Sequence, residues 1–371
     1  MNAVFCVYIL LLLSLSIFSY GFVDANFPLK TPVFLSDLVN LQRPLSTMVF
    51  IIIVTLLFGF YGWILWRTAE KRLTAKQIWF LIGITVFILF FSFPAFSYDI
   101  FNYLATAKVA FLYKENPYII MPIEFTGDPL LKFLHAANKI ALYGPVWILL
   151  TAIPHVAGLG NLILTVFTFK AFILVFYLGA ACLIWKLSGK NLKSLVFFAF
   201  NPLILIETLV SSHSDIVMMT FILLAFQFTF KKQRTRGFIS WILSIGIKYA
   251  TIVLLPVFLL EKKLSKEQIF YVSYWLMFLA FLLSPIREEI YPWYVIWLIT
   301  LAALIPQKRF IFCLTLALSV GTLLRYTPFL YTGTWEGITP LVKKIVTTVP
   351  LGLVSLAYFI DKLWLKRFFR S

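Results

Sequence analysis

One aspartate stands where a long apolar stretch ends. Asp99 follows the apolar residues 78–97 and opens the long segment 98–140. A carboxylate at the edge of a membrane span costs free energy unless it has a partner or a task. It could act as a general base that takes a proton from a hydroxyl group, or it could bond to loop amides at a helix end. Because Asn102 and Tyr103 follow about one helical turn later and can share its face, we expect a catalytic Asp99 in a polar pocket.

A second polar cluster follows the helix break at Asn201-Pro202. Glu207, His213 and Asp215 lie there within a few residues of one another. Together they could form a pocket wall that binds sugar hydroxyls or a phosphate, whereas His213 alone is more often an interfacial histidine. A divalent ion could bind here, but the spacing matches no recognised ligand pattern. We therefore assign no metal ligands, and the sequence shows no required cofactor.

Two lysines lie inside apolar stretches, Lys170 and Lys248. A lysine within a membrane is expensive and should pair with an anion. Glu207 or Asp215 could be that anion. A lipid phosphate that enters from the bilayer could be the anion instead, which would explain why two lysines are present.

Aromatic and turn-forming residues flank the polar clusters. Each is by itself more typical of a membrane-interface anchor, but aromatic rings also suit a groove that stacks a sugar ring. The other residues that we expect in the pocket are Tyr98, Asn116, Tyr118, Tyr143, Tyr249, Trp293 and Tyr294.

The composition indicates a polytopic membrane protein. Hydrophobic residues make up 61% of the chain and charged residues 13%, far from the averages of soluble domains. No polar segment is long enough to bury its own core, so residues 1–371 are predicted to form a single integral membrane domain. The net charge of +17 does not indicate a nucleic-acid partner, because the basic residues are spread over short loops between spans.

We predict an all-α fold with about ten spans plus re-entrant or interfacial helices. We expect residues 3–22 to be a retained first helix rather than a cleaved signal peptide, because no Lys or Arg precedes this long apolar run. The predicted spans are 3–22, 46–66, 78–97, 161–185, 194–210, 216–230, 269–285, 292–305, 310–325 and 341–360.

Two further apolar stretches, 141–158 and 237–260, are ambiguous. The distribution of Lys and Arg over the loops favours an arrangement in which 141–158 dips in from outside and 237–260 is a hairpin that enters from inside. Pro256 and the basic runs on both sides support the hairpin. Both termini are then expected in the cytoplasm, and the loops 98–140 and 211–215 share the outer face.

Taken together, these segments resemble the GT-C superfamily of membrane glycosyltransferases. The resemblance is closest to the polyprenyl-phosphate-mannose-dependent mannosyltransferases of bacterial and archaeal envelopes, and it covers a catalytic core of about residues 78–305. The segments that carry it are Tyr98-Asp99 with Tyr103, Asn116-Pro117-Tyr118, Tyr143-Gly144-Pro145, Asn201-Pro202-Leu203 through Glu207 to His213 and Asp215, Lys248-Tyr249 with Leu255-Pro256, and Pro292-Trp293-Tyr294.

The resemblance implies transfer of a hexose, mannose above all, from a polyprenyl-phosphate donor to a hydroxyl of a lipid or glycan acceptor. The reaction would invert the anomeric carbon and take place on the outer face of the plasma membrane. Asp99 corresponds to the catalytic aspartate, and Lys170 and Lys248 to basic residues near the donor phosphate. One departure is Ile100, which stands where many relatives carry a second acidic residue. Another is the loop 211–215, which is small or amide-containing in relatives. Metal dependence and the acceptor are therefore left open.

Two other classes of function stay open at this level. The intramembrane lysines and Glu207 could line the path of a transporter or lipid flippase, although no inverted repeat accompanies them. A glycan polymerase or ligase would need dense positive charge on the outer face, where the candidate arginines are Arg43, Arg287 and Arg325.

Overall fold

The computed structural model describes residues 2–286 and 289–368, and Arg287 therefore lies outside the described residues. Within these ranges the chain is helical and contains no strand, which confirms the predicted all-α fold. In chain order the α-helices are α1 (Asn2–Ser19), α2 (Val33–Asn40), α3 (Arg43–Ala69), α4 (Ala75–Phe90), α5 (Asp99–Ala107), α6 (Pro145–Ala157), α7 (Leu162–Leu187), α8 (Leu192–Ala199), α9 (Pro202–Ile204), α10 (Asp215–Phe230), α11 (Arg234–Ile245), α12 (Leu255–Leu259), α13 (Lys266–Leu283), α14 (Val295–Ala302), α15 (Arg309–Leu323), α16 (Tyr326–Thr332) and α17 (Thr339–Phe368).

Fewer helices than expected are long enough to cross a bilayer. In the described part of the chain 6 helices pass by length and apolarity, or 7 if α8 and the bent segment Pro202–Val210 count as one span. The predicted number of about ten spans is therefore not confirmed. Helix α4 shows the reason: its 16 residues rise about 24 Å at 1.5 Å per residue, less than the roughly 30 Å hydrocarbon core.

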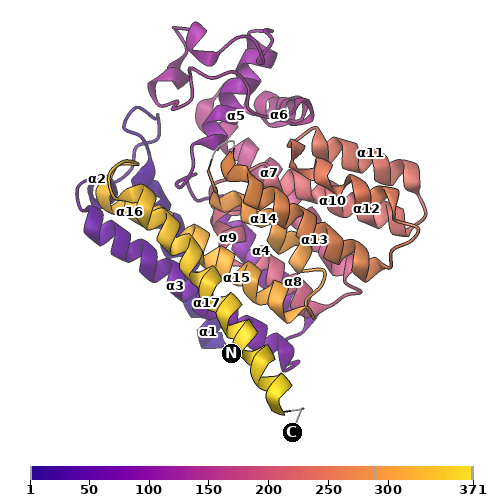
Figure 1. Cartoon of the computed structure of the whole chain (residues 1–371). Coiled ribbons are helices and arrows are strands. Elements are labelled where there is room, and N and C mark those ends of the chain that lie inside the picture. Colours follow the sequence, from indigo (N-terminus) through magenta and orange to yellow (C-terminus); the bar gives the residue numbers. More distant parts are fainter. Residues whose placement is uncertain (1, 287–288, 369–371) are drawn as a thin grey trace.

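The helices lie in two groups around a central set (Figure 1). Helices α1, α3, α15, α16 and α17 lie on one side, and α10 to α13 lie on the other, with α7, α8 and α9 between them. The loop that follows α5 forms a separate lobe at the top of the view. Helix α1 begins and α17 ends at the opposite end of the molecule.

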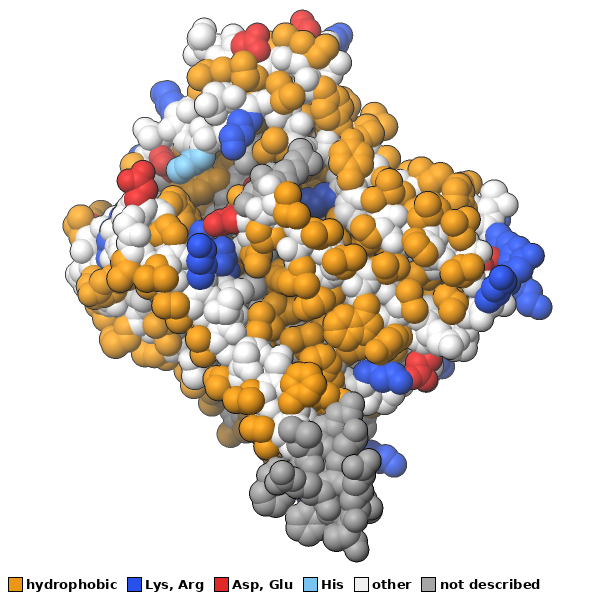
Figure 2. Space-filling model, in the orientation of Figure 1, with side chains coloured by type: hydrophobic (Ala, Val, Ile, Leu, Met, Phe, Trp, Pro, Cys, Tyr) orange, Lys and Arg blue, Asp and Glu red, His pale blue; other side chains and the backbone are white. Residues whose placement is uncertain are grey.

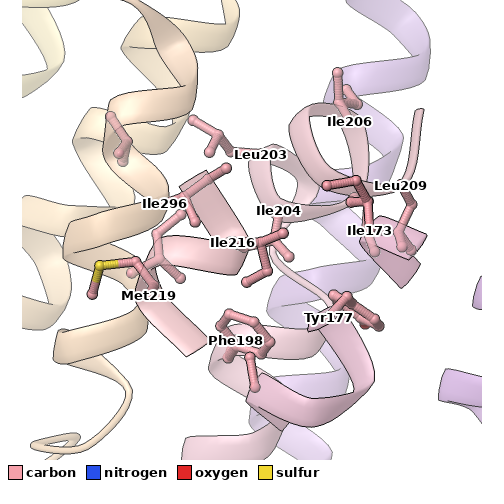
Figure 3. Packing of buried hydrophobic residues seen from close by; sticks show 14 of the residues in the cluster. Ile173, Tyr177, Phe198, Leu203, Ile204, Ile206, Leu209, Ile216, Met219 and Ile296 are labelled. Carbon is pink, nitrogen blue, oxygen red and sulfur yellow. The ribbon is translucent and has the colours of Figure 1, made fainter. Parts of the chain in front are cut away.

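The centre of the fold is one continuous buried segment. Every residue from 194 to 220 is buried, and this stretch includes the cluster of Glu207, His213 and Asp215. Figure 3 shows its apolar side chains together with those of α7 and α14, for example Ile204 and Ile216 between Ile173 and Ile296. Such close van der Waals packing fixes the backbone on which the polar cluster stands.

Residues 237–260 reverse direction, as the predicted hairpin requires. Helix α11 packs on the 3₁₀-helix Tyr249–Leu254, and Trp241 Nε1 donates a hydrogen bond to the Thr251 carbonyl at 2.8 Å. The ambiguous residues 141–158 contain a single short helix, α6, which packs on α5 and α7.

The tip of this hairpin is joined to the start of α6 by backbone hydrogen bonds. The amides of Gly144 and Val146 donate to the carbonyls of Ile247 and Gly246 at 3.0 and 2.8 Å. A side chain on Gly144 would overlap the Gly246 carbonyl.

We predict that Gly144→Ala lowers the free energy of unfolding by about 1–3 kcal/mol, the usual cost of overpacking. The matched control is Gly62→Ala in α3, where a new Cβ meets no atom within 4 Å and alanine favours the helix. Thermal unfolding in detergent measures both, and equal melting temperatures for the two variants would contradict the contact.

Candidate active site

Carboxylates from three elements surround one histidine. Asp99 is the first residue of α5, Glu207 lies in the π-helix Leu205–Val210, and Asp215 begins α10. His213 Nε2 lies 3.9 Å from Asp99 Oδ2, and its Nδ1 lies 3.2 Å from Glu207 Oε2. The structure thus brings together the two polar clusters that the sequence places far apart along the chain.

The backbone of residues 211–214 turns His213 back over Glu207. Ser212 has a φ of 63°, in the left-handed region that a non-glycine residue adopts only at a cost. The His213 amide then donates to the Glu207 carbonyl at 3.0 Å, and the Ser214 amide donates to Tyr103 Oη at 3.2 Å. A π-helix followed by a strained turn is typical of functional segments.

Aromatic rings fix the plane of the imidazole. The Trp293 ring stacks on His213 with centroids 4.1 Å apart and an interplanar angle of 19°. Tyr291 stacks in turn on Trp293 at 4.4 Å. The sequence predicted Trp293 in the pocket, and in the structure its ring stacks on His213.

Asp215 forms an ion pair with one of the two predicted lysines. Lys248 Nζ lies 2.6 Å from Asp215 Oδ2, and Trp297 Nε1 donates to Asp215 Oδ1 at 2.6 Å. Lys248 Nζ also lies 5.4 Å from the centroid of the Tyr294 ring. Asp215 is one of the anions that the sequence offered as a partner for Lys248.

Unlike Lys248, Lys170 does not pair with a carboxylate in the described part of the chain but contacts backbone carbonyls. Its side chain is buried, and Nζ donates to the carbonyls of Leu209 and Val210 at 2.7 and 3.1 Å and to Ser92 Oγ at 3.1 Å. These carbonyls end the π-helix and have no intrahelical partner. An ammonium group has three donors, and all three of them are engaged here, so Lys170 holds the segment that carries Glu207 and His213.

Tyrosines connect the outer loop to the cluster. Tyr103 lies with its ring centroid 4.8 Å from that of Tyr143, and Tyr118 donates from its hydroxyl to the Tyr143 carbonyl at 2.8 Å. Burial, followed by the charge of Asp99, raises the pKa of Tyr143, so its phenol stays protonated.

Two predicted pocket residues lie away from this buried cluster. Asn116 is exposed and its Oδ1 accepts from the Tyr118 amide at 3.0 Å. Tyr249 is 59% exposed. Their short sequence motifs indicated which segments lie near the site, but sequence alone could not show which way the side chains of Asn116 and Tyr249 point.

A cavity of about 680 Å³ opens on the face shown in Figure 2, below the upper lobe. Ser97 and Tyr98, directly before Asp99, line it together with Trp293. A second cavity of about 460 Å³ shares several of its walls, including Tyr98, Tyr326 and Trp335. The combined space is of the size that sugar or drug-sized ligands occupy.

Basic residues of the C-terminal helices line the larger cavity. Arg325 Nη2 lies 3.4 Å from Glu289 Oε2, and Lys343 Nζ lies 2.6 Å from Glu289 Oε1. Lys343 Nζ also lies 4.7 Å from the centroid of the Trp335 ring. Two cations thus share one carboxylate and leave a net positive charge in the cavity wall.

Sequence reasoning missed Lys343, Glu289 and Trp335. Arg325 was noted as an outer-face arginine but was not assigned to the site. The position of Lys343 could have indicated a role in the site, because this lysine falls within a predicted span just as Lys170 does. In the ranges 2–286 and 289–368, no group of three or more His, Cys, Asp or Glu residues is arranged to hold a metal ion.

The apolar helices fit a membrane protein, and comparison with family models identifies its class as glycosyltransferase. The chain belongs to the MptA_B family: residues 5–261 match the model of the alpha-(1->6)-mannopyranosyltransferase N-terminal domain. Among the curated proteins and solved structures compared with the chain, none matches significantly. The predicted relationship to mannosyltransferases is therefore confirmed, and a role in mannosyl transfer follows from it.

Proposed function

We propose that the protein transfers mannose from a polyprenyl-phosphate donor to a hydroxyl of a lipid or glycan acceptor, with inversion, on the outer face of the plasma membrane. The observation that carries this proposal is that one cavity is lined both by Ser97 and Tyr98, which directly precede Asp99, and by the basic residues Arg325 and Lys343. A base and a phosphate-binding group are the two parts that such a transfer needs.

Asp99 is the general base of the proposed reaction. It takes the proton of the acceptor hydroxyl, whose oxygen attacks the anomeric carbon of mannose from the face opposite the phosphate. The bond between that carbon and the phosphate oxygen breaks, and its electron pair leaves with the polyprenyl phosphate. Asp99 is partly exposed and directly follows Ser97 and Tyr98, which line the cavity.

The leaving phosphate gains negative charge as its bond to mannose breaks. Arg325 and Lys343 supply fixed positive charge in the same cavity, and such preorganised charge is usually the largest contribution to catalysis. Glu289 forms ion pairs with Arg325 and Lys343 and so balances part of their charge before the donor binds. Lys248, which is partly exposed and paired with Asp215, is a second group for the phosphate, whereas Lys170 acts through the backbone that it holds.

Aromatic rings in the cavity suit a pyranose ring. Tyr98, Trp293 and Trp335 line the larger cavity, and Tyr98 lies 4.0 Å from His135 between ring centroids. The smaller adjoining cavity, which Tyr98 also lines, offers room for the acceptor. No nucleotide sugar is available outside the cytoplasm, which is why a lipid-linked donor fits an outer-face site.

The proposal is tested with a panel of donors and the purified protein in detergent. We expect release of polyprenyl phosphate together with a mannosylated product from polyprenyl-phosphate mannose, and neither from polyprenyl-phosphate glucose nor GDP-mannose. Transfer from GDP-mannose alone would refute the lipid donor. Uptake of a labelled lipid or sugar into proteoliposomes without product would instead identify a transporter.

Sidedness is predicted from the same arrangement. Lys139 and Lys232 are both exposed. The loops that carry them are expected on opposite faces of the membrane. After Cys6, Cys182 and Cys313 are replaced by serine, a membrane-impermeant maleimide should label Lys139→Cys in intact cells. Lys232→Cys should be labelled only after the membrane is permeabilised. Labelling of both from one side would contradict the proposed topology.

A further inference from the structure

The hydrogen bonds of His213 fix which of its ring nitrogens can titrate. Nδ1 lies 3.0 Å from the Glu207 carbonyl oxygen and 3.2 Å from Glu207 Oε2. The carbonyl oxygen can only accept a hydrogen bond, and the same holds for Oε2 when Glu207 is ionised. With Glu207 ionised, Nδ1 therefore carries a proton in either charge state of the ring. The titrating atom is therefore Nε2, which faces Asp99 Oδ2 at 3.9 Å.

Nε2 is buried and forms no hydrogen bond with any described residue. His213 itself has no exposed surface, and Trp293 covers one face of its ring. The imidazole thus has no access to a substrate, although one end of it points at the proposed base. A group in this position acts on a substrate only through its neighbours, one of which is the proposed base Asp99.

The charges around the ring favour its protonated form. Asp99 of α5, Glu207 of the π-helix and Asp215 of α10 all face it, and Lys248 of the hairpin is paired with Asp215. Tyr326 of α16 donates to Glu207 Oε1 at 3.0 Å, and Tyr103 of α5 is neutral. Burial lowers the pKa of His213, but the hydrogen bond and charge of Glu207, followed by Asp99 and Asp215, outweigh burial and raise it.

We propose that protonated His213 is a bridge between Glu207 and Asp99 that keeps Asp99 ionised and correctly oriented as the base. His213 is thereby a positioning residue, and Glu207 is the group that holds its charge. The inference rests on the proposed function, since it assigns Asp99 the role of base. It adds a charged pair behind that base which neither the family match nor the sequence motifs assign.

A purely structural role does not explain this arrangement as well. Two buried carboxylates and an imidazole carry a large desolvation cost, and apolar side chains of similar volume would often be as stable. The strained φ of Ser212 adds to that cost. Such features persist where the position of a group matters for function.

The test is the pH–rate profile of His213→Gln with polyprenyl-phosphate mannose. Glutamine can still donate a hydrogen bond but carries no charge. We expect kcat to fall by about 10- to 100-fold, while KM for the donor stays within about threefold. The alkaline limb of the wild-type profile should disappear, because it reports loss of the imidazolium proton, and the acidic limb should move up by about one pH unit.

Two further variants keep the test decisive. His155 is a partly exposed histidine on α6 outside this cluster, and the control variant His155→Gln should leave the pH–rate profile unchanged. Glu207→Gln retains the imidazole but weakens its hold on the proton, so the alkaline limb should move to lower pH; this variant serves if His213→Gln does not fold. A wild-type profile in both cluster variants overturns the inference. An active Asp99→Asn variant would instead overturn the proposed function itself.

Discussion

Replacement of Asp99 by asparagine is expected to lower kcat by about 10²- to 10⁴-fold, the usual contribution of a general base. Asparagine keeps the size of the side chain and its ability to accept a hydrogen bond, but it cannot take a proton from the acceptor hydroxyl. The fold should be unaffected, because Asp99 lies at the first position of α5 and does not belong to its buried face. Transfer of radiolabelled mannose by the purified variant measures the effect.

A matched control separates the base from a general loss of charge. Glu115→Gln removes an exposed carboxylate of the upper lobe, where neither Glu115 nor its neighbours line a described cavity, and it should keep kcat within about threefold of the wild type. Near-normal turnover of Asp99→Asn would show that another group deprotonates the acceptor.

The second large effect is expected from the cations of the cavity wall. The double variant Arg325→Gln with Lys343→Gln should lower kcat/KM for the donor by about 10²- to 10³-fold, since it removes the charge that faces the leaving phosphate. Lys344→Gln is the matched control, because Lys344 is the exposed neighbour of Lys343 on α17. Steady-state kinetics with varied donor concentration measures all three.

Arg325 also donates to Thr347 Oγ1 at 3.1 Å, so its loss could loosen α17. Glu289→Gln removes this concern, because it leaves both cations in place and frees them from their carboxylate. We expect this variant to bind the donor more tightly than the wild type. Weaker donor binding by Glu289→Gln would show that the pair serves structure rather than phosphate recognition.

Much of the fold could be predicted from the sequence because the signals are local. Apolar runs set the helices, and Pro256 with its flanking basic residues indicated the hairpin that the structure contains. The number of spans was overestimated, because apolar character alone does not show where a helix ends. Helix α4, for instance, ends at Phe90, before the predicted boundary at residue 97.

The candidate site was predictable in its acidic half. Asp99, Glu207 and His213 each occupy costly positions, and the distribution of basic residues placed their loops on one face. The structure brings them within contact of one another. Neither the stack of Trp293 on His213 nor the engagement of Lys170 by backbone carbonyls could be predicted, because both depend on how distant helices pack.

The basic residues of the site could not be predicted from local sequence patterns either. Arg325, Lys343 and Glu289 come from three separate segments after residue 261, outside the region that matches the family. Nothing in the spacing of these residues indicates that they meet. Only the packing of α16 and α17 against the earlier helices gives the cavity its positive wall.

The central claim is that Asp99 acts as the base whereas Arg325 and Lys343 bind the donor phosphate. Equilibrium binding of radiolabelled polyprenyl-phosphate mannose tests this claim most directly. The Asp99→Asn variant should bind the donor with a Kd within about threefold of the wild type, whereas the Arg325→Gln, Lys343→Gln variant should bind it at least about tenfold more weakly. Loss of binding in the first variant together with intact binding in the second would contradict the account.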